Sequence, residues 1–143
     1  MSDVRDGDCF LALDTNLLVN SNFFTEENKY VRFIVSQNAI NFFENAVKEN
    51  TENSELAQAT LQRLEIASQQ GFNISTVIAY ADEVKELGLE HTFPATVMAS
   101  FYYAAIDAEQ KNNRRLFVVT LPGEQEGISI ANHLGLPTYI MQV

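Results

Sequence analysis

The chain has 143 residues, of which 46% are hydrophobic and 20% are charged, proportions typical of one folded domain rather than a disordered segment. Nine Lys and Arg against 19 Asp and Glu give a formal charge of -10, which argues against broad, nonspecific nucleic-acid binding but not against a nuclease whose carboxylates hold a cation. The single cysteine, Cys9, excludes an internal disulfide and a zinc cluster of thiolates.

The beginning of the chain contains one predicted strand. Its first residues, "MSDVRDGD", are polar and acidic, and no later run is long enough to span a bilayer, so we expect a cytoplasmic protein without a membrane partner. Residues 9–13, "CFLAL", are typical of a strand buried on both faces of a parallel sheet. The run ends at Asp14, which at this position either handles a metal or phosphate or caps the next helix.

The middle of the chain is predicted to be mostly helical. Apolar residues at helical spacing predict one long helix over about 26–48, although "YVRFIV" within it is also compatible with a strand. A polar break then leads to a second helix over about 54–71, with Ser54 as its cap and a glycine at its end. Residues 72–74 are expected to form a short strand, followed by a helix over 75–88 that Ser75 caps.

The last third is predicted to hold a helix, a strand, a helix and a strand. Pro94 suits the first turn of a helix, and the buried run "LFVVT" at 116–120 reads as a strand. "EQEGISIANHLG" predicts a short helix and "PTYIMQV" a final strand. A strand–helix–strand ending indicates a right-handed parallel crossover, so we expect a single domain over 1–143, with a three-layer α/β/α fold and a mostly parallel central sheet.

Two acidic loops are expected to meet at one edge of this sheet. Ligands of open parallel sheets gather beyond the carboxyl ends of the strands, where both Asp14 and the segment after Thr120 should lie. Carboxylate oxygens are the ligands that magnesium and manganese prefer. The pattern therefore suggests a site for Mg²⁺ or Mn²⁺.

At this level of detail the chain resembles the PIN domains, a family of compact α/β ribonucleases found among bacterial toxins and RNA-processing factors. "FLALDTNLL" resembles the first strand of the family, and "LFVVTLPGEQEGISIANHLGLPTYI" is similar to its strand, acidic loop, short helix and final strand. The likeness covers nearly the whole chain in the order of elements, and single residues match well only around Asp14 and Asn16. It implies a PIN-like, metal-dependent ribonuclease that acts on RNA phosphodiesters.

The resemblance also assigns roles to residues. Asp14 would be the first metal-binding carboxylate, and Asn16 and Thr120 would face the substrate. "ISTVIAYADEVKEL" resembles the segment that supplies the second acid of the family, which places that role on Asp82 or Glu83.

Two acids of the family pattern are missing or displaced. Ala95 and Thr96 occupy the first helical turn that normally presents a third aspartate, and Asp107 lies roughly 16 Å further along the same helix. After "LFVVT" the residues "LPG" intervene before Glu124 and Glu126, which are the candidates for the last acid. The site is therefore expected to be degenerate.

Each acidic residue also has a purely structural interpretation. Asp14 would be a turn or cap residue, Asp82 and Glu83 would belong to a solvated helix face, and Glu124 and Glu126 would be first-turn acids favoured by the helix dipole.

Two functions follow from these alternatives. The first is a metal-dependent endoribonuclease with RNA as its substrate. The second is a catalytically inactive PIN-like module that acts through protein contacts, and the missing acids and the charge of -10 favour it. The family resemblance also implies a protein partner such as an antitoxin, and self-association into a homo-oligomer.

Overall fold

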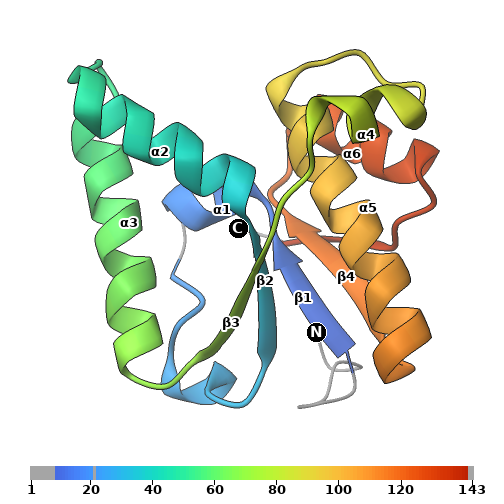
Figure 1. The fold of residues 1–143 in the computed structure, drawn as a ribbon. Coiled ribbons are helices and arrows are strands. Elements are labelled where there is room, and N and C mark those ends of the chain that lie inside the picture. Colours follow the sequence, from blue (N-terminus) through green and yellow to red (C-terminus); the bar gives the residue numbers. More distant parts are fainter. Residues whose placement is uncertain (1–8, 21, 142–143) are drawn as a thin grey trace.

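Short strands alternating with helices build a three-layer α/β/α structure (Figure 1). The computed structural model describes residues 9–20 and 22–141. In this part of the chain five parallel strands form one sheet, in the order β3-β2-β1-β4-β5. The strands are β1 Cys9–Leu13, β2 Arg32–Ser36, β3 Asn73–Val77, β4 Arg115–Thr120 and β5 Thr138–Ile140.

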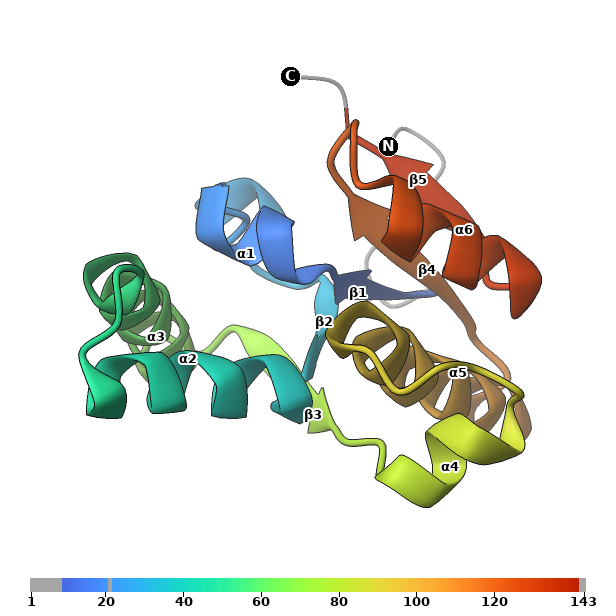
Figure 2. The ribbon, with the colours of Figure 1, turned by 90° about the horizontal axis from the view of Figure 1, so that it is seen from above.

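Helices cover both faces of the sheet, as the view from above shows (Figure 2). One face carries α1 Thr15–Asn20, α2 Gln37–Glu49 and α3 Ser54–Gln69; the other carries α4 Ala81–Glu86, α5 Phe93–Asn112 and α6 Gln125–His133. A short 3-10 helix, η1 Glu26–Asn28, precedes β2. The two faces follow from right-handed crossovers, because the chain moves from β1 to β3 and then returns past β1 to β4 and β5. Among the described helices, none has the length and apolar character needed to cross a membrane.

The core lies on both sides of the central strands. Leu11 of β1 pairs with Phe33 of β2 and with Phe117 of β4, and Leu11 and Phe33 are fully buried. The long helix α5 adds Phe101, also fully buried. Burial on both faces explains why the central strands are apolar runs without polar alternation.

Several sequence predictions are confirmed. The three-layer fold with a parallel sheet is present, and the strands predicted at 9–13 and 116–120 are β1 and β4. The helix predicted from Ser54 is α3, although Asn53 rather than Ser54 occupies its cap position. Pro94 lies in the first turn of α5, where Thr92 caps the helix by accepting a hydrogen bond from the Ala95 N–H.

The long helix predicted over 26–48 is wrong. Its first half forms η1 and the strand β2, and only its second half is helical, as α2. The run Phe33–Val35 is buried on both faces of the sheet between β1 and β3. Burial of a β-branched and aromatic segment inside the sheet outweighed the helical spacing of its apolar residues.

The helix predicted over 75–88 is also wrong in its first half. Ser75 lies within β3, whose residues pair with β2 along the whole length of both strands. The helix that follows, α4, is only six residues long. Backbone pairing with β2 therefore extended the edge strand beyond the predicted 72–74.

Arg63 of α3 fixes the short helix α1. Its guanidinium donates hydrogen bonds to the main-chain carbonyls of Leu18 and Val19, both at 3.1 Å. These carbonyls belong to the last turn of a six-residue helix, where no further helical N–H can satisfy them. Arg63 therefore anchors the segment that directly follows Asp14.

Replacing Arg63 by Met should lower the free energy of unfolding by about 1–3 kcal/mol, since two partly buried carbonyls lose a charged donor. Urea denaturation followed by circular dichroism measures the change. Arg114→Met is the matched control, because within the described residues the half-buried Arg114 side chain makes no hydrogen bond or ion pair. Equal losses in both variants would show that Arg63 acts only through its aliphatic stem.

Candidate active site at the carboxyl end of the sheet

The candidate site lies where the direction of the chain connections reverses. From β1 the chain runs to β2 on one side, whereas β4 joins the other side of β1 after a long return. Such a switch point between adjacent parallel strands is where open α/β sheets bind ligands. Asp14 directly follows β1 and Thr120 ends β4, so both predicted residues lie at this point.

The Asp14 carboxylate is buried and held by two hydrogen bonds. Asp14 as a whole residue is 6% exposed. Its Oδ1 accepts a hydrogen bond from the Thr15 N–H and its Oδ2 accepts one from the Thr120 hydroxyl, both at 2.8 Å. The main-chain carbonyl of Asp14 accepts from Leu17 and Leu18 and so begins α1. The capping interpretation therefore explains the hydrogen bonds of the Asp14 main chain. It does not explain why the Asp14 carboxylate is bonded to Thr120 of the neighbouring strand β4.

A second carboxylate reaches the same place from α6. Glu124 directly precedes that helix, and its Oε2 accepts a hydrogen bond from Nδ2 of Asn16 at 3.0 Å. The amide oxygen of Asn16 is buried and has no hydrogen-bond partner among the described residues. The same holds for the Thr15 hydroxyl. Asn16 therefore orients Glu124 and keeps one oxygen available.

Most buried polar side chains of the described part gather at this end of the sheet. Of five such residues, Asp14, Ser36 and Thr120 end or follow central strands, and Ser100 of α5 hydrogen-bonds with Ser36 at 3.0 Å. Only Thr60 of α3 lies elsewhere. Burying a polar group costs free energy unless the group is hydrogen-bonded. The grouping of buried polar side chains at this end of the sheet therefore indicates a functional site rather than part of the hydrophobic core.

Gly127 lets α6 approach the Asp14 carboxylate. A Cβ atom at this position would lie 3.5 Å from Asp14 Oδ2, 3.4 Å from Met98 Cε and 3.3 Å from Glu124 Cγ. Sequence reasoning missed Gly127. Its one signal was a glycine inside a helical pattern three residues after Glu124.

Burial raises the pKa of both carboxyls, and the negative charge of Asp14 adds to the rise at Glu124. For Asp14, burial raises the pKa above its ordinary value of 3.8, while the hydrogen bonds from Thr120 and Thr15 offset part of the rise. For Glu124, burial and then the negative charge of Asp14 raise the pKa above 4.5, and the Asn16 amide opposes the rise. Binding of a proton or of a cation between the two carboxyl groups is therefore favoured.

Asp82 and Glu83, the predicted second acid, lie away from this cluster. Both belong to α4, which follows the edge strand β3, and Figure 2 shows α5 between α4 and the start of α1. The Glu83 carboxylate accepts a hydrogen bond from the Tyr80 N–H at 2.9 Å. Glu83 thus caps its own helix, and Asp82 is exposed.

Glu126 lies next to the site but lines a different hollow. That hollow, of about 260 Å³, is bounded by Glu126, Glu90, Thr92 and Ala95. Ala95 is buried in the first turn of α5, where the family pattern would place an aspartate. Across the described residues, no group of three or more His, Cys, Asp or Glu side chains comes together. The oxygen donors that do meet are two carboxylates and the Asn16 amide.

Comparisons with known proteins match the fold only. No protein-family model matches the chain, and no curated protein matches its sequence. A solved structure described as a domain of a functionally unknown protein from Methanocaldococcus jannaschii DSM 2661 is similar, with a TM-score of 0.64 and 13% sequence identity, over 94% of this chain and 92% of that one. At that identity the similarity shows a shared fold and nothing about function.

The raised pKa values predict how Asp14→Asn changes stability with pH. A carboxyl whose pKa is raised in the folded state binds its proton more tightly there than in the unfolded chain. Such a group stabilises the fold at acid pH, and this contribution is lost as the pH rises from the ordinary pKa of the carboxyl to its raised pKa in the folded state. Asp14→Asn removes one such group and lowers the repulsion on Glu124. Without divalent ions, the melting temperature of the variant minus that of the wild type should therefore increase from acid to neutral pH. Scanning calorimetry measures this difference, and a constant or falling value would contradict the account.

Proposed function

We propose that the chain is a PIN-like, metal-dependent ribonuclease in which Asp14 and Glu124 hold Mg²⁺ or Mn²⁺. The observation that carries the proposal is the convergence of the two carboxylates at the switch point. Beside them lies the amide oxygen of Asn16, which has no hydrogen-bond partner among residues 9–20 and 22–141. The resemblance of "FLALDTNLL" to the first PIN strand supplies the reaction class, cleavage of RNA phosphodiesters.

The residues present fit a hard divalent cation. All available donors are oxygens, which magnesium and manganese prefer. A cation would give the buried Asn16 Oδ1 its missing partner. It would also remove the repulsion between Asp14 and Glu124 that raises the pKa of Glu124.

The protein side chains would contribute positioning and proton transfer. The Thr120 hydroxyl and the Thr15 N–H fix the orientation of the Asp14 carboxylate. Asn16 directs Glu124, whose raised pKa suits a group that takes a proton from water. A bound Mg²⁺ or Mn²⁺ supplies activation of that water and stabilisation of charge on the phosphate oxygens.

The second candidate is a catalytically inactive PIN-like module that acts through protein contacts. It is favoured by the position of Asp82 and Glu83 on α4 and by Ala95 in the first turn of α5, which leave two carboxylates at the site. In that case the chain would bind a protein, such as an antitoxin-like partner or a second copy of itself, instead of cutting RNA.

Calorimetric titration with Mn²⁺ separates the two candidates. The wild type should bind manganese saturably and cut single-stranded RNA, and Asp14→Asn should lose both properties while remaining folded. Asp82→Asn is the matched control, since it removes an equal charge from α4 and should bind manganese as the wild type does. A wild type that binds no manganese would support the inactive module.

Gly127→Ala tests the geometry of the site without removing a ligand. The added methyl group would crowd Glu124 Cγ and Asp14 Oδ2, so manganese affinity should fall severalfold. Alanine also favours the helix by about 1 kcal/mol over glycine, so a general loss of stability is not expected to explain the result. Ser129→Ala, on an exposed position of the same helix, is the control. Unchanged affinity in Gly127→Ala would place the cation away from Asp14 Oδ2.

A further inference from the structure

A pocket of about 200 Å³ lies next to the candidate active site, between α1, α2 and α3. Thr15 and Val19 of α1 form one of its walls. These two residues are four positions apart, so they share one face of that helix. Thr15 directly follows Asp14, and its N–H donates the 2.8 Å hydrogen bond to the Asp14 carboxylate. A substrate held at the proposed metal site therefore lies beside this pocket.

The pocket is apolar, with a buried floor and an exposed rim. Phe43 and Ala46 of α2 and Ala57 of α3 are buried and form the floor. Phe42 and Leu56, from the same two helices, are 46% and 48% exposed and form the rim. The volume is smaller than the roughly 300–1,000 Å³ of sites for drug-sized ligands. The pocket therefore suits a single ring system.

The ring of Phe42 is held in place although it is exposed. Its centre lies 4.7 Å from that of Phe93, with an interplanar angle of 33°, and 6.1 Å from that of Phe43, with an angle of 71°. Phe93 begins α5 and does not line the pocket. Phe42 thus packs against α5 and also borders the pocket. An exposed aromatic ring in a fixed orientation is the surface on which single-stranded nucleic acids stack their bases.

Asn53 adds a polar group at the edge of the pocket. It is an exposed residue directly before α3, and its side chain makes no capping hydrogen bond to that helix. A side-chain amide carries hydrogen-bond donors and an acceptor, as the edges of nucleobases do. The apolar walls, the aromatic ring and the amide together match an unpaired base.

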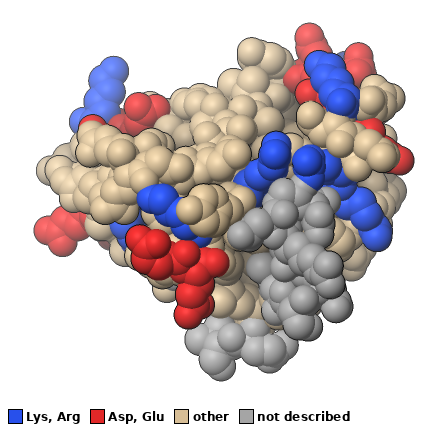
Figure 3. Space-filling view, turned by 90° about the horizontal axis from the view of Figure 1, so that it is seen from below, with Lys and Arg blue, Asp and Glu red and all other residues tan. Residues whose placement is uncertain are grey.

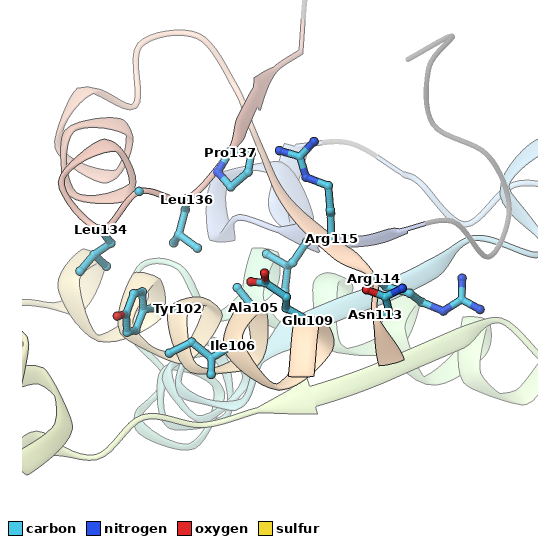
Figure 4. A pocket seen from close by; sticks show the side chains of 12 residues that line it. Tyr102, Ala105, Ile106, Glu109, Asn113, Arg114, Arg115, Leu134, Leu136 and Pro137 are labelled. Carbon is cyan, nitrogen blue, oxygen red and sulfur yellow. The ribbon is translucent and has the colours of Figure 1, made fainter. Parts of the chain in front are cut away.

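Three arginines lie at the opposite end of the sheet. Arg32 begins β2, and Arg114 and Arg115 lie at the beginning of β4, beside a larger pocket of about 440 Å³ (Figure 4). Seen from below, Lys and Arg side chains gather near the middle of this end of the molecule (Figure 3). Since β4 has six residues, at about 3.3 Å per residue its two ends are roughly 17 Å apart. Contacts with a base therefore supply affinity that these arginines cannot give to a phosphate at Asp14.

We propose that the pocket between α1, α2 and α3 binds one unpaired nucleobase of the RNA substrate, stacked on Phe42 and with its polar edge on Asn53. This inference rests on the proposed ribonuclease function and adds a specificity subsite to it. The phosphate lies at Asp14, and an adjoining base enters the pocket. Bases within a duplex are stacked and paired, so the pocket selects single-stranded segments.

Titration with adenosine and with uridine in EDTA, followed by the methyl NMR signals of Val19 and Leu56, tests the base pocket apart from the nuclease. The nucleosides are uncharged, so the protein charge of -10 does not oppose their binding. Saturable shifts are expected at Val19 and Leu56 and none at Leu116 or Leu134, and ribose alone should cause no shift. No saturable shift with either nucleoside would overturn the proposal. Equal binding of N-acetylphenylalaninamide would assign the pocket to a protein side chain and overturn it as well.

Two half-exposed residues can be changed without altering the buried core. Phe42→Leu removes the aromatic ring and should weaken nucleoside binding about fivefold or more, and Leu56→Ala should weaken it severalfold. Tyr30→Leu and Ile66→Ala are the matched controls, because each shortens an exposed side chain of the same kind that does not line the pocket. Losses of equal size in the variants and their controls would count against the base pocket.

Manganese titration and RNA cleavage distinguish failure of the pocket from failure of the nuclease. If both proposals hold, Phe42→Leu should raise the KM for single-stranded RNA about fivefold or more and leave manganese affinity unchanged. A wild type that binds nucleosides in the pocket but neither binds manganese nor cuts RNA would refute the nuclease and keep the base pocket. RNA cleavage with an unchanged KM in Phe42→Leu would refute the base pocket alone.

Discussion

The hydrogen bond between the Thr120 hydroxyl and the buried Asp14 carboxylate is the interaction on which the rest of the site depends. It joins the ends of β1 and β4, the two strands that meet at the switch point of the sheet. Asp14 also begins α1 with its carbonyl, and Arg63 holds the other end of that helix. A buried anion is therefore built into the junction of two strands and a helix.

The burial of Asp14 and Glu124 disfavours their charged forms. Burial raises the pKa of Asp14, and burial together with the negative charge of Asp14 raises the pKa of Glu124. Asn16 donates a hydrogen bond to Glu124 but not to Asp14, and in the part of the chain that the structure describes its own amide oxygen has no hydrogen-bond partner. In the proposed metal-dependent reaction, a divalent cation would offset the repulsion between the two carboxylates and give the Asn16 oxygen a partner.

The sequence allowed part of this site to be predicted. Asp14 and Thr120 were found because apolar runs buried on both faces mark the central strands and therefore their carboxyl ends. The sequence around β2 predicts a helix incorrectly, because the short apolar run fits both helical and strand spacing. Its pairing with β1 and β3 makes it a strand. Asp82 and Glu83 were predicted beside Asp14, but β3 lies at the edge of the sheet and α4 leads away from the switch point. The contact of Gly127 with Asp14 depends on how α6 packs, which no local pattern encodes.

The measurement that tests the central claim most directly is paramagnetic broadening of NMR signals by substoichiometric Mn²⁺. If Asp14, Asn16 and Glu124 surround the cation, the side-chain amide of Asn16 and the backbone amide of Gly127 should broaden first, while the amides of Asp82 and Glu83 remain sharp. Broadening centred on α4, or spread evenly over the acidic surface, would contradict a cation site at the switch point.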